Sequence, residues 1–158
     1  MNSALALGLA FGIGIVAGLR SLTAPAVVAW AAHLGWINLH GTPLTFMGSA
    51  WAVGVFSILA LVELVADKLP NTPSRTAPVG LSARIGTGAL TGACFAVAGG
   101  TPLLLGALAG AIGGIAGAFG GYNARVGLVP ALRIPDFAVA IPEDVVAIGL
   151  GLFLVSRF

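Results

Sequence analysis

The sequence predicts an all-α integral membrane protein that crosses the bilayer several times. Of its 158 residues, 58% are apolar and 8% are charged, and the mean hydropathy is +1.07. Soluble domains carry about 25% charged residues, so this composition excludes a soluble globular chain as well as a disordered one. The apolar stretches are continuous, which favours helices over the alternating strands of a membrane barrel. The chain has 24 glycines, and those within these stretches indicate closely packed transmembrane helices.

Five apolar stretches approach the length of about 20 residues that a membrane-spanning helix needs. They cover Ala4–Leu19, Phe46–Ala66, Val79–Ala98, Leu103–Gly121 and Pro142–Val155. A sixth stretch follows the first without a loop, and one helix through both would be about 50 Å long. Because the hydrocarbon core is about 30 Å thick, we expect a break near Arg20. The pattern therefore predicts a short re-entrant or interfacial helix over Thr23–Trp36, with Thr23 as N-cap.

The distribution of Lys and Arg predicts how the helices are oriented, since short cytoplasmic loops are rich in these residues. The segments Ile37–Thr45 and Gly99–Pro102 contain none. The basic residues cluster after the second and the fourth predicted helix, at Lys68, Arg75, Arg84, Arg125 and Arg133. This alternation predicts five spans, with the N-terminus in the cytoplasm and the C-terminus outside.

A shift of 105 residues places the first predicted helix on the fourth and indicates an internal repeat. Gly8 and Gly12 then align with Gly113 and Gly117, and Arg20-x4-Pro25-Ala26 aligns with Arg125-x4-Pro130-Ala131. The chain is thus predicted to be a single integral membrane domain (1–158), with repeats at 1–70 and 102–158 and a linker helix at 78–99. One linker helix would give the repeats inverted topologies. The alternative is two unrelated Gly/Ala-rich helices that each end in an arginine.

Charged side chains within predicted spans are costly in lipid and mark functional sites. Glu63 and Asp67 are four residues apart and lie on one face of the second predicted helix. We expect Arg20, Glu63 and Arg125 to form one buried network at the repeat interface, although Asp67 can equally mark the end of a helix. The residues predicted for a substrate path or polar network are Arg20, Glu63, Asp67, Arg84, Arg125, Glu143 and Asp144.

Two further patterns concern helix packing. The third predicted helix carries a polar stripe, Arg84, Thr87, Thr91 and Cys94, which indicates interhelical hydrogen bonds or the lining of a path. The fourth carries repeated small-xxx-small spacing, which allows other helices to approach closely. Its packing residues are predicted to be Gly106, Gly110, Gly113, Gly114, Gly117 and Gly121. Such glycine-rich faces are also the expected contacts of a homo-oligomer.

Several site classes find no support in the sequence. His33 and His40 have no Cys or carboxylate near them, so we expect no metal site. Motifs of hydrolases and metalloproteases are absent, so we expect no enzyme activity and no cofactor. The basic residues are scattered between apolar segments, which argues against nucleic acid as a partner.

Three short motifs carry a resemblance to a known family. They are Gly18-Leu19-Arg20-Ser21, Glu63-x3-Asp67-Lys68-Leu69-Pro70 and Pro142-Glu143-Asp144. Together they resemble a family of small bacterial inner-membrane proteins catalogued as domain of unknown function number 4126. The resemblance covers nearly the whole chain and implies a polytopic fold in the bacterial inner membrane, but no activity and no substrate.

The residues favour a small channel or transporter with a path at the interface of the inverted repeats. Because arginine binds carboxylate and phosphate well, Arg20 and Arg125 favour an anionic or small polar solute. The alternative is a scaffold or lipid-binding protein that transports nothing, in which glycines and charges serve packing and assembly. Membrane lipids are the expected partners in both cases. A polar cavity touching Arg20, Glu63 and Arg125 would favour transport, and mutual burial of these groups would favour the scaffold.

Overall fold

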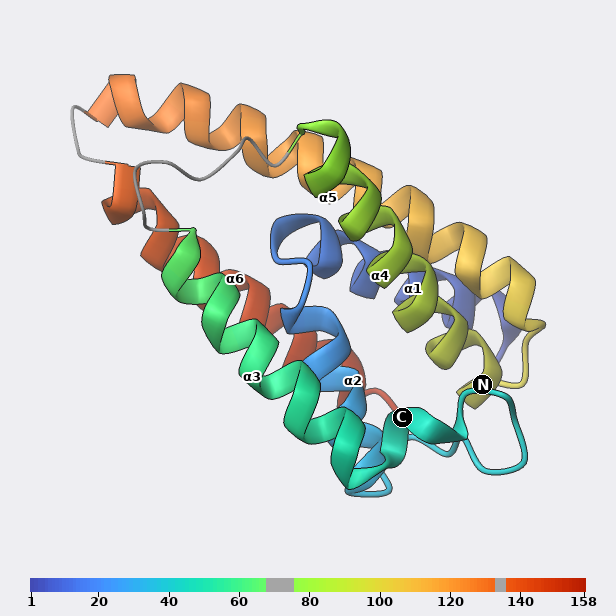
Figure 1. The fold of residues 1–158 in the computed structure, drawn as a ribbon. Coiled ribbons are helices and arrows are strands. Elements are labelled where there is room, and N and C mark those ends of the chain that lie inside the picture. The colour runs from blue at the N-terminus through green and yellow to red at the C-terminus, as the bar shows by residue number, and fades with distance from the viewer. Residues whose placement is uncertain (68–75, 133–135) are drawn as a thin grey trace.

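The computed structural model describes residues 1–67, 76–132 and 136–158, and these residues form helices and loops without any strand. The elements are α1 (Ser3–Leu19), α2 (Thr23–His33), the short 3-10 helix η1 (Thr45–Gly48), α3 (Ala50–Ala66), α4 (Pro78–Ala98), α5 (Leu103–Leu132) and α6 (Asp136–Val155) (Figure 1). Three of them, α4, α5 and α6, are long and apolar enough to cross a membrane. The prediction of a helical membrane protein is confirmed at this level, while the count of five spans stays a prediction.

The helix positions follow the apolar stretches closely, and the two largest differences concern α5 and α6. α5 continues past Gly121 to Leu132 and contains Pro130, and α6 begins before Pro142 and contains it. A proline removes one backbone hydrogen bond from a helix, and membrane helices tolerate this loss where neighbouring groups satisfy the freed carbonyl. Both prolines therefore lie inside helices, whereas the predicted apolar stretches ended at Gly121 and began at Pro142.

The break predicted near Arg20 is present. α1 ends at Leu19, and Arg20 has an extended backbone (φ −138°, ψ 106°) while its N–H still donates to the Val16 carbonyl at 2.8 Å. α2 begins three residues later at Thr23. Asn2 caps the start of α1 by accepting a hydrogen bond from the Leu5 N–H. The apolar run is thus divided into two short helices with Arg20 between them.

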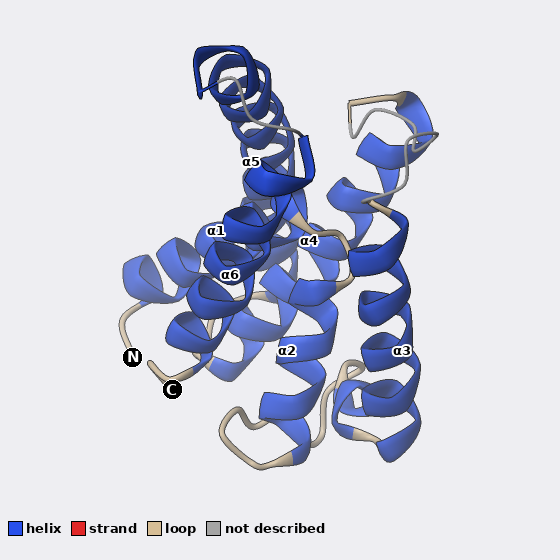
Figure 2. Cartoon of the chain, turned by 90° about the vertical axis from the view of Figure 1, so that its left-hand side faces the viewer, coloured by secondary structure: helices blue, strands red, loops and turns tan. Residues whose placement is uncertain are grey.

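The two chain ends lie close together (Figures 1 and 2). At the end of α4, a methyl group on Gly99 would contact the side chains of Met1 and Ala6, and the ring of Phe95 packs against Phe158 with 5.0 Å between centroids. The expectation that the N- and C-termini lie on opposite sides is therefore wrong.

The reason is that α1 and α2 form a helical hairpin whose tip is Arg20. The helices have 17 and 11 residues, or about 26 Å and 17 Å of length. α2 runs in the same direction as α6, because Arg20 at the tip meets Asp144 while Val27 further on contacts Gly151. The hairpin therefore leads the chain back toward the end of the molecule at which α1 begins.

α5 lies against both α4 and α1, and glycines form both contacts. On one face of α5, a methyl group added to Gly110 or Gly114 would overlap backbone atoms of α4. On an adjacent face, a methyl group added to Gly113 or Gly117 would overlap backbone atoms of α1. Gly106 likewise meets α4 at Ala96 and Gly92, and Gly121 is buried. We call α1, α4 and α5 the glycine-packed group.

These contacts also give the relative direction of the helices. Gly14 of α1 meets Gly110, and Gly18 meets Gly114 and Gly117, so α1 and α5 run in the same direction. Inverted repeats would run them in opposite directions. The predicted inversion is therefore wrong, and the aligned positions also differ: Arg125 lies inside a continuous helix, whereas Arg20 lies at a break.

The remaining helices form the hairpin-side group, in which α2 packs against both α3 and α6. The Trp30 indole N–H donates to Ser57 Oγ at 3.0 Å and joins α2 to α3. In the described part of the chain, the backbones of α3 and α6 do not approach each other closely. The two groups meet along α1, α2 and α6 (Figure 1).

Candidate functional site: an ion-paired cluster at the hairpin tip

A fully buried arginine occupies the tip of the α1–α2 hairpin. The side chain of Arg20 is 0% exposed, and its two terminal nitrogens form ion pairs with Asp67 and Asp144. Asp67 follows the last residue of α3, and Asp144 lies in α6. Arg20 therefore bridges two helices whose backbones do not approach each other closely.

Glu63 binds the first residues of the hairpin's second arm. One carboxylate oxygen accepts hydrogen bonds from the Ser21 N–H (2.8 Å) and the Ser21 hydroxyl (2.6 Å), and the other accepts from the Leu22 N–H (2.9 Å). Backbone N–H groups at the start of a helix lack intrahelical partners and favour negative charge. Glu63, a residue of α3, thus accepts hydrogen bonds from the backbone N–H groups just before α2.

Arg84 performs the converse role for the first arm. Its Nε donates to the Gly18 carbonyl and its Nη1 to the Gly80 carbonyl, both at 3.0 Å. Carbonyls at the end of a helix lack N–H partners, so a buried cation from α4 satisfies the end of α1. The hairpin tip is therefore held by side chains from α3, α4 and α6.

The cluster lies deep relative to the ends of the apolar helices. Gly18 packs at Gly114 and Gly117 of α5, and Gly117 is about 21 Å along the helix axis from its start at Leu103. Asp144 is about 17 Å from Val155, the end of α6. With a hydrocarbon layer of about 30 Å, the ion pairs lie inside the hydrophobic layer when the first residues of α5 mark its edge.

Besides the ion-paired atoms, two buried polar atoms at the hairpin tip have no hydrogen-bond partner among the described residues. They are Nε of Arg20 and the hydroxyl of Thr23, whose residues are 0% and 4% exposed. Buried donors of this kind are usually satisfied by ordered water. The chemistry of the tip therefore suits a few bound waters beside the ion pairs.

The structure brings together five of the seven residues predicted for a polar network. Arg20, Asp67 and Asp144 pair directly, and Glu63 and Arg84 hold the backbone on either side of them. Arg125 and Glu143 are half-buried in α5 and α6. Among the described residues, neither of them is a partner of Arg20 or Glu63, so the expected network of Arg20, Glu63 and Arg125 is replaced by one in which two aspartates neutralise Arg20.

The polar stripe of α4 does not join helices to each other through its threonines. The Thr87 hydroxyl donates to the Ala83 carbonyl and the Thr91 hydroxyl to the Thr87 carbonyl, both at 2.9 Å. These bonds stay within α4, and Thr91 and Cys94 are buried. Of the residues in this stripe, Arg84 is the one whose side chain donates to another helix, at the Gly18 carbonyl of α1.

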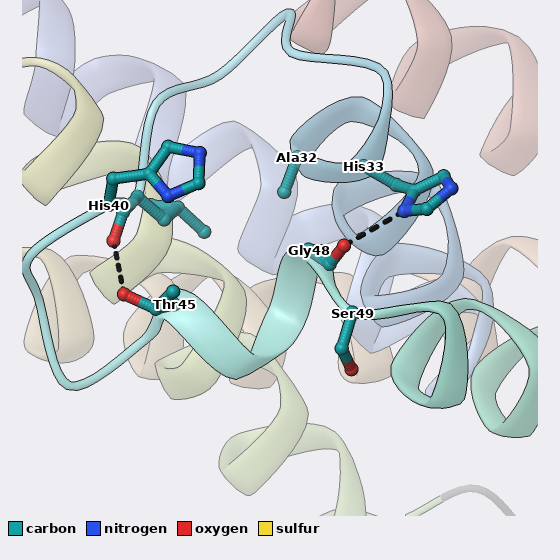
Figure 3. Close-up of a pocket in the computed structure, with 7 residues that line it drawn as sticks. Ala32, His33, His40, Thr45, Gly48 and Ser49 are labelled. Carbon is teal, nitrogen blue, oxygen red and sulfur yellow. Dashed lines mark hydrogen bonds between the residues drawn. The ribbon is translucent and has the colours of Figure 1, made fainter.

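A second feature was missed by the sequence analysis: a pocket of about 290 Å³ at the opposite end of α2 (Figure 3). His33 and His40 both line it, and His33 Nδ1 donates to the Gly48 carbonyl at 2.9 Å. Thr45 Oγ1 donates to the Leu39 carbonyl at 2.8 Å. In the described ranges, no three or more metal-ligating side chains gather. The two histidines are seven residues apart, and this spacing alone does not predict that the loop between them places both in one pocket.

Residues 7–156 match the family Domain of unknown function (DUF4126). The chain therefore belongs to this family, which confirms the resemblance noted in the three short motifs. No curated protein and no solved structure matches the chain.

Proposed function

For this member of the DUF4126 family, we propose a small membrane transporter or channel that carries a small polar solute past the Arg20 cluster. The observation that carries the proposal is a 0% exposed arginine, ion-paired to two aspartates, at a helix break in an apolar helical protein. Charged residues inside membrane segments commonly belong to solute paths or proton relays. Discontinuous helices are likewise typical of transporter binding sites.

The arrangement of the helices supports the same proposal. The glycine-packed group is fastened by contacts between backbones, whereas α3 and α6 are joined to each other mainly through Arg20 and α2. A rigid group beside a less tightly connected one suits the rocking motion of alternating access. The proposed path runs between these two groups and ends at the hairpin tip.

The preference for an anionic solute loses its support in this arrangement. Both terminal nitrogens of Arg20 already meet carboxylates, so an anion would have to displace Asp67 or Asp144. Three carboxylates and two guanidinium groups surround the tip among the described residues: Glu63, Asp67, Asp144, Arg20 and Arg84. A neutral or cationic polar solute suits these groups better than an anion does.

We also propose an orientation in the bacterial inner membrane. Both termini lie at the same end as Gly99, close to a turn without Lys or Arg. The connections after α3 and α5 contain Lys68, Arg75 and Arg133, which lie outside the described residues. By the positive-inside rule, the connections face the cytoplasm and both termini face away from it.

The second candidate is a scaffold or lipid-binding protein that assembles through glycine-rich faces and transports nothing. The observation that favours it is that Arg20 is ion-paired with both aspartates and the group is nearly closed to solvent, with Asp67 and Asp144 side chains 14% and 12% exposed. In a scaffold, such a cluster would serve only to hold the hairpin in place.

Flux measurements on purified protein in liposomes separate the two candidates. The panel should contain labelled inorganic cations, inorganic anions, amines and neutral polyols, with Arg20→Gln and, as the matched control, Arg157→Gln, whose arginine lies exposed over the Phe153 ring. Transport predicts uptake of at least one cation or neutral solute that Arg20→Gln abolishes and Arg157→Gln retains. Uptake no greater than that of protein-free liposomes for the whole panel would favour the scaffold.

A further inference from the structure

We infer that Asp67 and Asp144 form a proton-binding site, and that protonation of one of them breaks its ion pair with Arg20 and detaches its helix, α3 or α6, from the hairpin tip. This inference rests on the proposed transport function and names the proton as its coupling ion. A proton from the aqueous phase adds to one carboxylate oxygen, which abolishes that ion pair without breaking any covalent bond. Its departure to the other side restores the pair.

The first step is the sharing of one guanidinium by two carboxylates. Arg20 carries one positive charge and meets Asp67 and Asp144 together. In a medium of low dielectric constant, each unbalanced charge is costly, so a site with two carboxylates and one cation suits the uptake of one proton.

The second step is to identify which carboxylate changes its protonation state. The charged groups that face the tip come from α3 (Glu63, Asp67), α4 (Arg84) and α6 (Asp144 with its neighbour Glu143), and within the described residues α1 and α2 add Arg20 alone near it. α5 carries Arg125 further along. Glu63 accepts three hydrogen bonds, and a proton on it would oppose them. Asp67 and Asp144 remain as the pair that accepts the proton.

The third step is the route of the proton. The Arg20 Nε–H and the Thr23 hydroxyl are buried and have no partner among the described residues. Water is the ligand that satisfies such groups, and a water at the tip also conducts a proton to the neighbouring carboxylates. Both aspartate side chains are also partly exposed, so the proposed route connects them to the solvent.

The consequence for the fold follows because the backbones of α3 and α6 do not approach each other closely. Arg20 joins the end of α3 to α6. When one aspartate becomes neutral, its helix loses this link, while α1, α4 and α5 stay fastened through their glycines. Protonation should therefore move the hairpin-side group away from the glycine-packed group at this end of the molecule.

The experiment measures a distance between the two groups in liposomes at pH 8 and pH 5. Spin labels are placed at Val62→Cys on α3 and Asn123→Cys on α5, both exposed positions, in a Cys94→Ala background. We expect the distance distribution to shift to longer values at pH 5. Asp67→Asn combined with Asp144→Asn should show the long distance at both pH values, and Arg157→Gln, the exposed control, should behave like the parent.

An unchanged distance at both pH values in the parent would overturn the inference, even if the double variant fails to fold. The same holds if Arg157→Gln alone abolishes the shift. A pH-dependent distance in a protein that transports nothing from the panel would support the proton site and contradict the transport function. Solute uptake without a pH-dependent distance would do the reverse, so the two failures are distinguishable.

Discussion

At the scale of single residues, the hairpin tip depends on charges that are expensive to bury. The idealised cost of moving an ion into a low-dielectric interior is of order 20 kcal/mol, and attraction between partners offsets it only with good geometry. Arg20 achieves this with two carboxylates, and Glu63 with three hydrogen bonds. Loss of one member should therefore be costlier than loss of the whole pair.

Arg20→Gln is expected to lower the free energy of unfolding by about 3–5 kcal/mol, because it leaves two aspartates uncompensated. Asp144→Asn in the same chain should reduce this loss, so that the double variant costs less than the sum of the singles by about 0.5–3 kcal/mol. Denaturation in detergent micelles measures all three values. Strict additivity would show that the two side chains do not interact.

Glu63→Gln should destabilise the protein by about 1.5–3 kcal/mol, the typical contribution of hydrogen bonds to a charged group. Ser21→Ala removes the hydroxyl bond but leaves both backbone bonds to Glu63, so its effect should be smaller. The same denaturation assay ranks the two variants. Equal losses would mean that Glu63 does not support the start of α2.

The sequence predicted which residues form the cluster better than how they pair. Glu63 and Asp67 were recognised because carboxylates four residues apart share a helix face, and Arg20 because it interrupts an apolar run. Its partners come from α3 and α6, far along the chain. Only the packing of α2 between those helices brings the three side chains together, and no local pattern encodes that packing.

At the scale of helices, glycine spacing predicted close approach but not direction. Gly106, Gly110 and Gly114 meet α4, and Gly113 and Gly117 meet α1, as two adjacent faces of one helix. Small residues four apart look the same read in either direction, so the parallel course of α1 and α5 could not be predicted from them. The apolar runs gave the helix positions because membrane helices need continuous apolar sequence.

Gly18→Ala should destabilise the protein, because its methyl group would overlap backbone atoms at Gly114, Gly117 and Ala118. Overpacking of this kind typically costs about 1–3 kcal/mol. Gly8→Ala is the matched control in the same helix, since nothing lies within 4 Å of that position. Melting temperatures in detergent compare the two. If Gly18→Ala melts no lower than Gly8→Ala, the close contact between α1 and α5 is wrong.

At the scale of the whole molecule, one short hairpin brings the N-terminus to the same end as the C-terminus. The pattern of basic residues constrains the connections after α3 and α5, and it does not depend on whether α1 crosses the membrane. That pattern therefore could not predict that the two chain ends lie together. The 11 residues of α2 lead the chain back toward the end of the molecule at which α1 begins.

The most direct test of this account is the labelling of cysteines from each side of the membrane, in a Cys94→Ala background. Cysteines at Asn2, Asn38 and Asn71 are treated with a membrane-impermeant thiol reagent in sealed vesicles of known orientation. A re-entrant hairpin predicts that positions 2 and 38 react from the same side and position 71 from the opposite side. Reaction of positions 2 and 38 from opposite sides would show that α1 crosses the membrane, and would contradict the placement of the Arg20 cluster at a hairpin tip within the bilayer.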